Sequence, residues 1–191
     1  MDASTIATRW RDSFGAFEPV GYVCRDRLRS RWLRIHSLPH SKRYPDTESE
    51  YEELLRRHNE AATTLLGTGE ECVLFVASFL DAPGISDRTE LSSLAGTAFV
   101  DVPDLSTAGE TDDMTISFEA AVVSWKPDRF NDLIRAVADE RAGPVLFANL
   151  GRHTAYAPYD GGADLFCDSQ EAVVKMKVAW QDWLSARVDG L

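Results

Sequence analysis

The sequence predicts a single α+β domain in which a mixed sheet of about five or six strands packs with three or four helices. The length of 191 residues is that of one domain, so residues 1–191 are expected to share one core. Apolar residues make up 44% and charged residues 27% of the chain, as in soluble globular proteins. Segments with helical and with strand periodicity alternate along the chain, which predicts both kinds of element in one fold.

The N-terminal part begins with a predicted helix over 4–17. Ser4 suits its N-cap, and apolar side chains follow at near-helical spacing. Residues 31–38 then alternate between apolar and polar side chains, which predicts a strand. Two prolines bound the segment 39–45, which is expected to be a loop.

The clearest predicted element is a helix over 47–66. Thr47 and Glu50 form a capping box at its start, an apolar stripe runs along it, and Gly67 ends it. His58 lies on this stripe and is expected to be buried and hydrogen-bonded.

The middle of the chain combines buried strands with a polar excursion. Residues 71–80 form an apolar, β-rich run that predicts a central strand. Residues 81–113 contain eight acids against one arginine, which predicts an acidic surface excursion with a short strand at 97–102. A strand over 114–125 follows, and then a helix over 127–140 with proline in its first turn.

The C-terminal part predicts a strand over 145–150, then a hairpin and a last helix. Strands at 152–158 and 163–167 flank a turn containing Asp160-Gly. Asp168 with Glu171 is expected to cap a helix over 169–187. The residues expected to be largely buried in the whole domain are Leu54, Leu55, Leu65, Phe75, Phe118, Val122, Leu133, Val145, Phe147, Trp180 and Leu184.

The net charge of −11 is divided unevenly along the chain. Residues 61–191 carry 9 Lys and Arg against 21 Asp and Glu, and such an acidic excess argues against a nucleic-acid partner. Within the nearly neutral N-terminal part, residues 25–43 contain seven cations opposed by one acid, a cluster that could hold an anion. These cations are Arg25, Arg27, Arg29, Arg31, Arg34, Lys42 and Arg43.

Two stretches resemble a known bacterial family. They are Arg31-Trp-Leu-Arg-Ile-His-Ser-Leu-Pro-His-Ser-Lys-Arg-Tyr-Pro45 and Tyr156-Ala-Pro-Tyr-Asp-Gly-Gly-Ala-Asp-Leu-Phe166, the second followed by Trp183-Leu-Ser and Gly190-Leu191. They are similar to a group of uncharacterised single-domain proteins, a domain of unknown function. The similarity runs from Trp32 to the C-terminus and is weakest over 81–113. It implies a bacterial, cytoplasmic α/β protein and brings no catalytic residues.

The segment 31–44 is the first candidate site. His36, His40, Lys42 and Arg43 surround a loop after a strand, where cations could bind a phosphate or a carboxylate. The alternative is a charged edge strand followed by a turn, with no ligand. The prolines argue against a helix that would place both histidines at a metal, and we expect no metal and no cofactor.

The hairpin at 156–164 is the second candidate site. Asp160 and Asp164, with Tyr159 beside them, could place two carboxylates at a hairpin tip for acid–base chemistry. The alternative is a turn alone, because Asp-Gly favours a two-residue turn. If the two candidate sites are neighbouring strands, Arg34 or Arg43 is expected to pair with one of these carboxylates in a structural role.

Several common sequence motifs are absent from the chain. Cys24, Cys72 and Cys167 form no Cys-x-x-Cys pair, and we expect them to be free and inert. The sequence lacks nucleophile-elbow, Walker, zincin and dinucleotide motifs. No run approaches 18 consecutive apolar residues and the start does not resemble a secretory signal, so we expect a cytoplasmic protein without a membrane partner.

Two functions of different classes follow from these patterns. The first is a non-catalytic binding or regulatory protein that masks a basic partner protein, as an immunity protein covers a toxin, with 81–113 as a contact surface. The second is a hydrolase or transferase acting on a small anion held by Arg34, Lys42 and Arg43 of the 31–44 segment. His36 and Asp160 are the acid–base candidates of such an enzyme. No pattern indicates an oligomeric state. The candidate ligand-binding residues are Arg34, His36, His40, Lys42, Arg43, Tyr159, Asp160 and Asp164.

Overall fold

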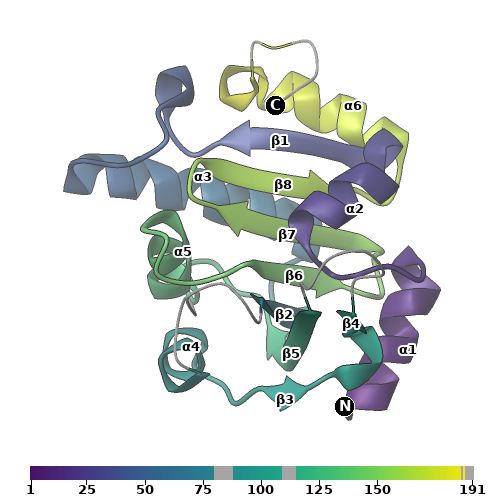
Figure 1. Ribbon diagram of the computed structural model, residues 1–191. Helices are drawn as coiled ribbons and strands as arrows, with labels where there is room; N and C mark the ends of the chain where they lie inside the picture. Colours follow the sequence, from purple (N-terminus) through teal and green to yellow (C-terminus); the bar gives the residue numbers. More distant parts are fainter. Residues whose placement is uncertain (80–87, 109–114, 186, 188–191) are drawn as a thin grey trace.

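The fold is built on one antiparallel sheet, seen in the computed structural model in Figure 1, which describes residues 1–79, 88–108, 115–185 and 187. The strand order is β1-β8-β7-β6-β2-β5-β3, with β4 also paired to β5. The strands are β1 Trp32–His36, β2 Glu71–Phe79, β3 Val100–Asp101, β4 Thr107–Ala108, β5 Thr115–Ser124, β6 Val145–Asn149, β7 Thr154–Tyr159 and β8 Gly162–Phe166.

The α+β class is confirmed, but the prediction of a mixed sheet with five or six strands was wrong. The described strands number eight, and all the pairings between them are antiparallel. Strand direction depends on where each connection returns the chain, and the local alternation of side chains carries no such information. The strand β4 is two residues long, too short for a periodic pattern to reveal.

Six α-helices lie among the described residues, and two of them, α2 and α4, were not expected. Both are short: α2 has seven residues and α4 has eight. The predicted helices over 47–66, 127–140 and 169–187 are present, although the last two are shorter than predicted. The helices are α1 Ala3–Phe14, α2 Gly21–Arg27, α3 Glu48–Leu66, α4 Arg88–Ala95, α5 Asn131–Ala138 and α6 Gln170–Ala179.

The capping box was predicted correctly in position but not in all its bonds. The Glu50 N–H donates to Thr47 Oγ1 at 3.3 Å, as predicted, and α3 ends at Gly67 with φ +80°. The Glu50 carboxylate, however, accepts from the Asp46 N–H at 2.7 Å. The first turn of α3 is therefore tied to the loop before it.

The caps predicted for α1 and α6 were each wrong by one or two residues. The N-cap of α1 is Asp2 and not Ser4, because the Asp2 carboxylate accepts from the Thr5 N–H at 2.8 Å. The N-cap of α6 is Ser169 and not Asp168. Short polar side chains in succession offer several caps, and the local sequence does not rank them.

Helices cover both faces of the sheet. In Figure 1, α2 lies in front of the sheet and α3 behind it. Along β2, Leu74 faces the side of α3 and α5, whereas Phe75 faces the side of α1. The central strands are therefore buried on both faces, which explains why their sequences are continuous apolar runs without alternation.

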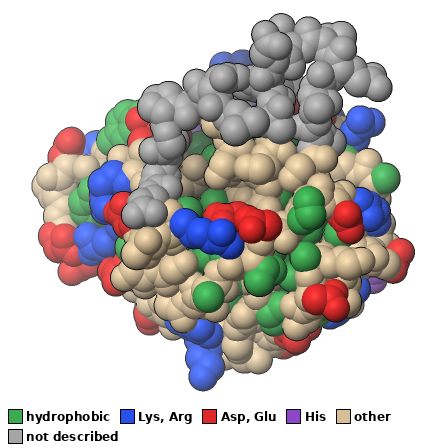
Figure 2. Space-filling model, turned by 60° about the horizontal axis from the view of Figure 1, so that its bottom comes forward, with side chains coloured by type: hydrophobic (Ala, Val, Ile, Leu, Met, Phe, Trp, Pro, Cys, Tyr) green, Lys and Arg blue, Asp and Glu red, His purple; other side chains and the backbone are tan. Residues whose placement is uncertain are grey.

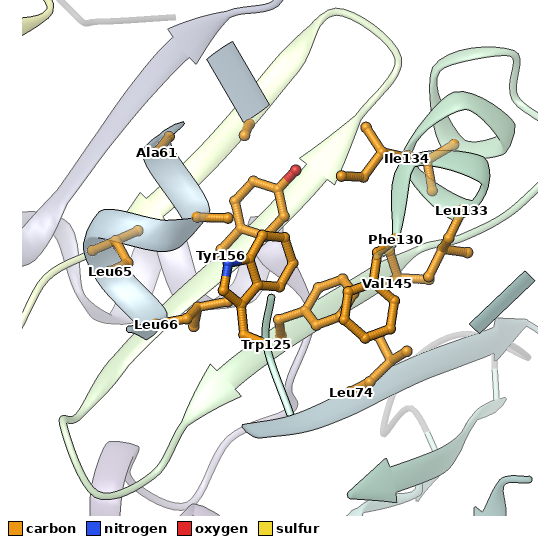
Figure 3. Packing of buried hydrophobic residues seen from close by; sticks show 14 of the residues in the cluster. Ala61, Leu65, Leu66, Leu74, Trp125, Phe130, Leu133, Ile134, Val145 and Tyr156 are labelled. Atoms are coloured by element: carbon orange, nitrogen blue, oxygen red, sulfur yellow. The ribbon is translucent and has the colours of Figure 1, made fainter. Parts of the chain in front are cut away.

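The core prediction is confirmed for nine of its eleven residues. The two exceptions are Val122 and Leu184, which are half-buried and pack against the edges of the two apolar clusters. Figure 3 shows the cluster on the α3 side, where Trp125, Phe130 and Tyr156 meet between α3, α5 and the sheet.

The described part of the 81–113 excursion, residues 88–108, packs against the domain. Leu91 of α4 is buried, and so are Phe99, Val102 and Leu105 further along the segment. Residues 81–87 and 109–113 lie outside the described residues. The described half therefore belongs to the core and is not a solvated loop.

No helix in the described part of the chain combines the length and the apolarity that a membrane-spanning helix needs.

Candidate functional site

The two candidate segments lie side by side in the sheet. Strand β1 pairs with β8, and Arg34 lies opposite Asp164 in the register. Side chains of β1 alternate between the faces, and Trp32 belongs to the apolar cluster on the α2 side while Leu33 belongs to that on the α3 side. Arg34 and His36 have the same parity as Trp32 and therefore project toward the α2 side.

Arg34 and Asp164 form a largely buried bidentate ion pair. Arg34 Nε donates to Asp164 Oδ1 at 2.8 Å, and Nη2 donates to Oδ2 at 3.1 Å. The Trp32 indole N–H also donates to Oδ1, at 2.9 Å. The Arg34 guanidinium stacks 4.8 Å from the Tyr159 ring centre. Burial opposes the charge of Arg34, but the contact with Asp164 outweighs it and raises the pKa of the guanidinium.

Arg43 and Asp160 form a second pair at the turn of the hairpin. Arg43 donates to Asp160 Oδ2, and the Tyr44 hydroxyl donates to the same oxygen at 3.1 Å. The side chain of Arg43 is 61% exposed, so this pair lies at the surface. The sequence suggested that Arg34 or Arg43 would pair with one of the hairpin carboxylates, and in the structure each of the two arginines pairs with one of them.

The other residues of the loop after β1 do not join these two pairs. Lys42 Nζ lies 2.8 Å from Asp46 Oδ2 and 2.5 Å from Glu50 Oε1, at the start of α3. His40 is exposed and has a positive φ of 58°. The structure thus separates His40 and Lys42 from the hairpin and brings Arg34, Arg43, Tyr159, Asp160 and Asp164 together.

His36 has an unsatisfied ring nitrogen. Its Nε2 atom is buried and has no hydrogen-bond partner among the described residues. Burial lowers the pKa of His36, and the nearby charges of Arg34 and Arg57 lower it further. His36 is therefore held in the neutral form and lies opposite Gly162 at the end of β1.

Buried polar groups on the α3 side of the sheet form a chain that the sequence did not reveal. Ser37 Oγ lies 2.8 Å from His58 Nε2, and His58 Nδ1 lies 2.7 Å from the Tyr156 hydroxyl. His58 was expected to be buried and hydrogen-bonded, and both expectations are confirmed. Its partners come from 21 and 98 residues away, which no local pattern signals.

The chain of Ser37, His58 and Tyr156 is a structural element of the core. All three residues are at most 1% exposed, so no substrate can reach the serine. Burial raises the pKa of Tyr156 well above its ordinary value, and burial together with the charge of Arg57 lowers the pKa of His58 to about 3. One ring nitrogen of neutral His58 donates and the other accepts, which satisfies the three groups.

We expect His58 to make folding stability fall as the pH decreases below about 6.5. The unfolded chain takes up a proton on this residue near pH 6.5, whereas the folded chain takes it up only near pH 3. Between these values the unfolded state binds more protons, so the free energy of unfolding falls toward acid with a slope approaching about 1.4 kcal/mol per pH unit. Urea titrations at several values between pH 5 and 7 measure this slope.

The matched variants for this experiment are His58→Gln and His36→Gln. His58→Gln is expected to reduce the slope of the free energy of unfolding against pH, whatever the stability of the variant at pH 7. His36→Gln is expected to remove a smaller part, because burial and the same kind of charge lower its pKa too. Equal slopes in the parent and His58→Gln would contradict the assignment.

The three cysteines are free and buried. Burial raises the pKa of all three thiols, to about 12 for Cys72 and Cys167. A thiol that stays protonated is a poor nucleophile and a poor metal ligand. Within the described residues, His, Cys, Asp and Glu side chains also form no group of three that could hold a metal.

A pocket of about 220 Å³ opens beside the Arg34–Asp164 pair. Its walls come from α2, β1, β7, β8 and the start of β6, so it connects both candidate segments to a helix that the sequence did not predict. Two of its lining residues, Tyr22 and Arg25, were not among the candidate site residues. The cation cluster at 25–43 was the one signal that pointed to Arg25. The full lining is Val20, Gly21, Tyr22, Arg25, Arg34, Pro144, Val145, Ala157, Pro158, Tyr159 and Asp164.

Comparison with known proteins gives one match. A family model described as "Domain of unknown function (DUF3885)" matches residues 20–188. No curated protein and no solved structure matches the chain.

Proposed function

The chain belongs to the DUF3885 family, a domain of unknown function, and we propose that it is a non-catalytic binding protein that masks a basic partner protein, in the manner of an immunity protein. The observation that carries the proposal is that Arg34, Lys42 and Arg43 are paired with carboxylates, while the exposed surface of α3 and α5 carries more acids than arginines. A charged, tyrosine-bearing surface is suited to binding a protein.

The pairing of the cations counts against the alternative of a hydrolase or transferase acting on an anion at 31–44. Arg34 is held by Asp164, Arg43 by Asp160 and Lys42 by Asp46 and Glu50. An anionic substrate would have to displace these carboxylates. His36, the candidate acid–base group, lies between cations and stays neutral. Its Nε2 is buried, whereas a general base must reach the substrate.

The acidic face lies on the neighbouring helices α3 and α5. The Tyr51 hydroxyl donates to Asp139 at 2.6 Å, and Glu48 pairs with Arg135, so the two helices run side by side. We define the acidic face by its exposed acids, which outnumber the arginines among them. These acids are Glu48 and Glu52 of α3, Asp132 of α5, and Asp139 and Glu140 directly after α5.

Two tyrosines add contact area to the acidic face. Tyr44 is 45% exposed, and its hydroxyl oxygen lies 3.0 Å from Glu140 Oε1 as well as 3.1 Å from Asp160 Oδ2. Tyr51 is half-buried, and the Arg135 guanidinium lies 4.5 Å from its ring centre. Tyrosines held in place by hydrogen bonds lose little entropy on binding and are enriched at protein interfaces. An arginine-rich partner could pair with the acids and stack on these rings.

The face below β3 is less suited to a basic partner. Figure 2 shows acidic and basic side chains next to each other on this face. Arg88 lies 2.7 Å from Glu119 and 3.6 Å from Asp101, so one cation offsets part of the charge of these two acids at this edge of the sheet. We therefore place the contact with the partner on α3 and α5, and not on the described part of the 81–113 segment.

We also propose a cytoplasmic location in a bacterium. Three free cysteines in one small domain fit a reducing compartment, where thiols are not driven into disulfides.

Binding of a small basic globular protein, cytochrome c, tests the acidic face by calorimetry at low ionic strength. The variant Glu48→Lys/Glu52→Lys/Asp132→Lys is expected to weaken binding at least tenfold, because three favourable charge contacts become repulsive. The parent's affinity should fall as salt is added, since exposed charges are screened.

The control for net charge is Asp168→Lys/Glu171→Lys/Asp182→Lys, which makes the same charge change at and around α6. All three of these acids are exposed. This variant is expected to bind cytochrome c within about threefold of the parent. Equal losses in the two variants would show that only net charge matters and would overturn the assignment of the acidic face.

A further inference from the structure

We propose that the pocket between α2 and β7 binds a small aromatic carboxylate, a ligand with one ring and one acidic group. The pocket lies on the opposite side of the sheet from α3 and α5, so this proposal does not depend on the acidic face. Figure 1 shows α2 crossing in front of β7 and β8, and residues of these three elements line the pocket.

The walls of the pocket are suited to a flat apolar body. Val20, Val145, Ala157 and Pro158 supply aliphatic surface, and Tyr22 supplies an aromatic ring that is 43% exposed. Apolar walls with a few polar groups are typical of small-molecule sites. A ligand without an apolar part would leave this surface in contact with water.

The net charge of the residues that line the pocket suits a ligand with one negative group. Its lining contains two guanidiniums, Arg25 and Arg34, and one carboxylate, Asp164. Asp164 already neutralises Arg34 through two hydrogen bonds. Among the lining residues the charge of Arg25 therefore remains, and the exposed Asp26 beside it lies outside the lining.

Arg25 is available to a ligand. The contact given for it is from its Nε to the Oδ1 of the neighbouring Asp26 at 3.4 Å, and Asp26 is 67% exposed. Within the described residues, the two terminal nitrogens of Arg25 have no hydrogen-bond partner. A guanidinium whose terminal nitrogens are free at the wall of an apolar pocket can bind a carboxylate.

The hydroxyls of Tyr22 and Tyr159 can contribute to carboxylate binding only in their neutral form. Burial raises the pKa of Tyr22, and it raises the pKa of Tyr159 to about 12. Both phenols therefore stay protonated at neutral pH and do not repel an anion. Either hydroxyl can donate a hydrogen bond to a carboxylate.

The size of the pocket limits the ligand to one ring. A cavity of about 150 Å³ holds benzene, whereas drug-sized ligands occupy about 300 Å³ or more. The volume of about 220 Å³ lies between these values and matches a benzene ring with one carboxylate. Benzoate is therefore the smallest probe that uses both the apolar wall and the cation.

Titration of the full chain with benzoate, followed by calorimetry and by chemical shifts of labelled protein, tests the proposal. We expect saturable one-to-one binding, with shifts at Tyr22, Ala157 and Tyr159. Arg25→Gln should weaken benzoate binding at least tenfold. Benzamide, which has the ring without the charge, should bind the parent and Arg25→Gln equally weakly.

Two further variants keep the result interpretable. Arg27→Gln removes an exposed cation of the same helix that does not line the pocket, and it should bind benzoate as the parent does. Ala157→Leu should fill the pocket and abolish binding of both probes. If Ala157→Leu does not fold, the comparison of Arg25→Gln with Arg27→Gln decides alone.

Three results would overturn the proposal. The first is no saturable binding of benzoate at millimolar concentration. The second is equal weakening in Arg25→Gln and Arg27→Gln, which would indicate a general charge effect. The third is binding of acetate or inorganic phosphate as tightly as benzoate, which would show that the apolar wall does not contribute.

Discussion

Replacement of Asp164 by Ala is expected to lower the free energy of unfolding by about 3–5 kcal/mol, because it leaves a largely buried guanidinium without its counter-ion. Asp164 is 4% exposed and accepts hydrogen bonds from Arg34 and from the Trp32 indole. The Arg34 side chain is 15% exposed and cannot turn fully into water. Urea unfolding of the parent and the variant at pH 7 measures the loss.

The pair of Arg43 with Asp160 is the internal comparison for this result. Arg43 is 61% exposed, and the Asp160 carboxylate, which is 10% exposed, keeps the Tyr44 hydroxyl beside it at 3.1 Å when Arg43 is truncated. Arg43→Ala should therefore cost much less than Asp164→Ala. Similar losses of unfolding free energy in Asp164→Ala and Arg43→Ala would mean that Arg34 is as well hydrated as Arg43.

Truncation of Trp125 to Ala is expected to cost about 3–5 kcal/mol through the cavity that it leaves. Trp125 is fully buried at the centre of the cluster in Figure 3. Its ring lies 5.5 Å from that of Phe130, 5.4 Å from that of Phe147 and 6.0 Å from that of Tyr156. The indole N–H donates to Thr63 Oγ1 at 3.0 Å, so the truncation also removes a hydrogen bond.

The matched control for Trp125 is Val178→Ala on α6. Val178 is 73% exposed, and its truncation should change stability by no more than about 0.5 kcal/mol. Thermal and urea unfolding of both variants measure the difference. A loss below about 1 kcal/mol in Trp125→Ala would show that the neighbouring rings collapse into the space.

Two kinds of feature follow from the local sequence. The first is an element with a strong period and strong end signals, such as α3 with Thr47 at its start and Gly67 at its end. The second is a turn with its own chemistry, such as the one between β7 and β8, where Asp160 precedes a glycine. In both cases the deciding interactions join residues a few positions apart, so the chain carries the information within each segment.

The pairing of Arg34 with Asp164 could be predicted from the sequence only in part. The cations at 25–43 and the carboxylates in the hairpin suggested an ion pair on the condition that the two segments are neighbours in the sheet. They did not indicate which cation would pair with which carboxylate. The register of β1 on β8 decided that, by placing Arg34 opposite Asp164 on one face.

Only the tertiary structure decided the direction of the strands, the location of the two sites and the fate of the cation cluster. The seven cations of 25–43 form one basic cluster in the sequence. In the structure Arg34 pairs with Asp164, Lys42 pairs with Glu50, and Arg25 lines a pocket. Ser37, His58 and Tyr156 meet because three distant segments pack at one point. The physical reason is the same in each case. Burial and the pairing of charges depend on contacts between residues far apart in the chain, and local periodicity does not predict those contacts.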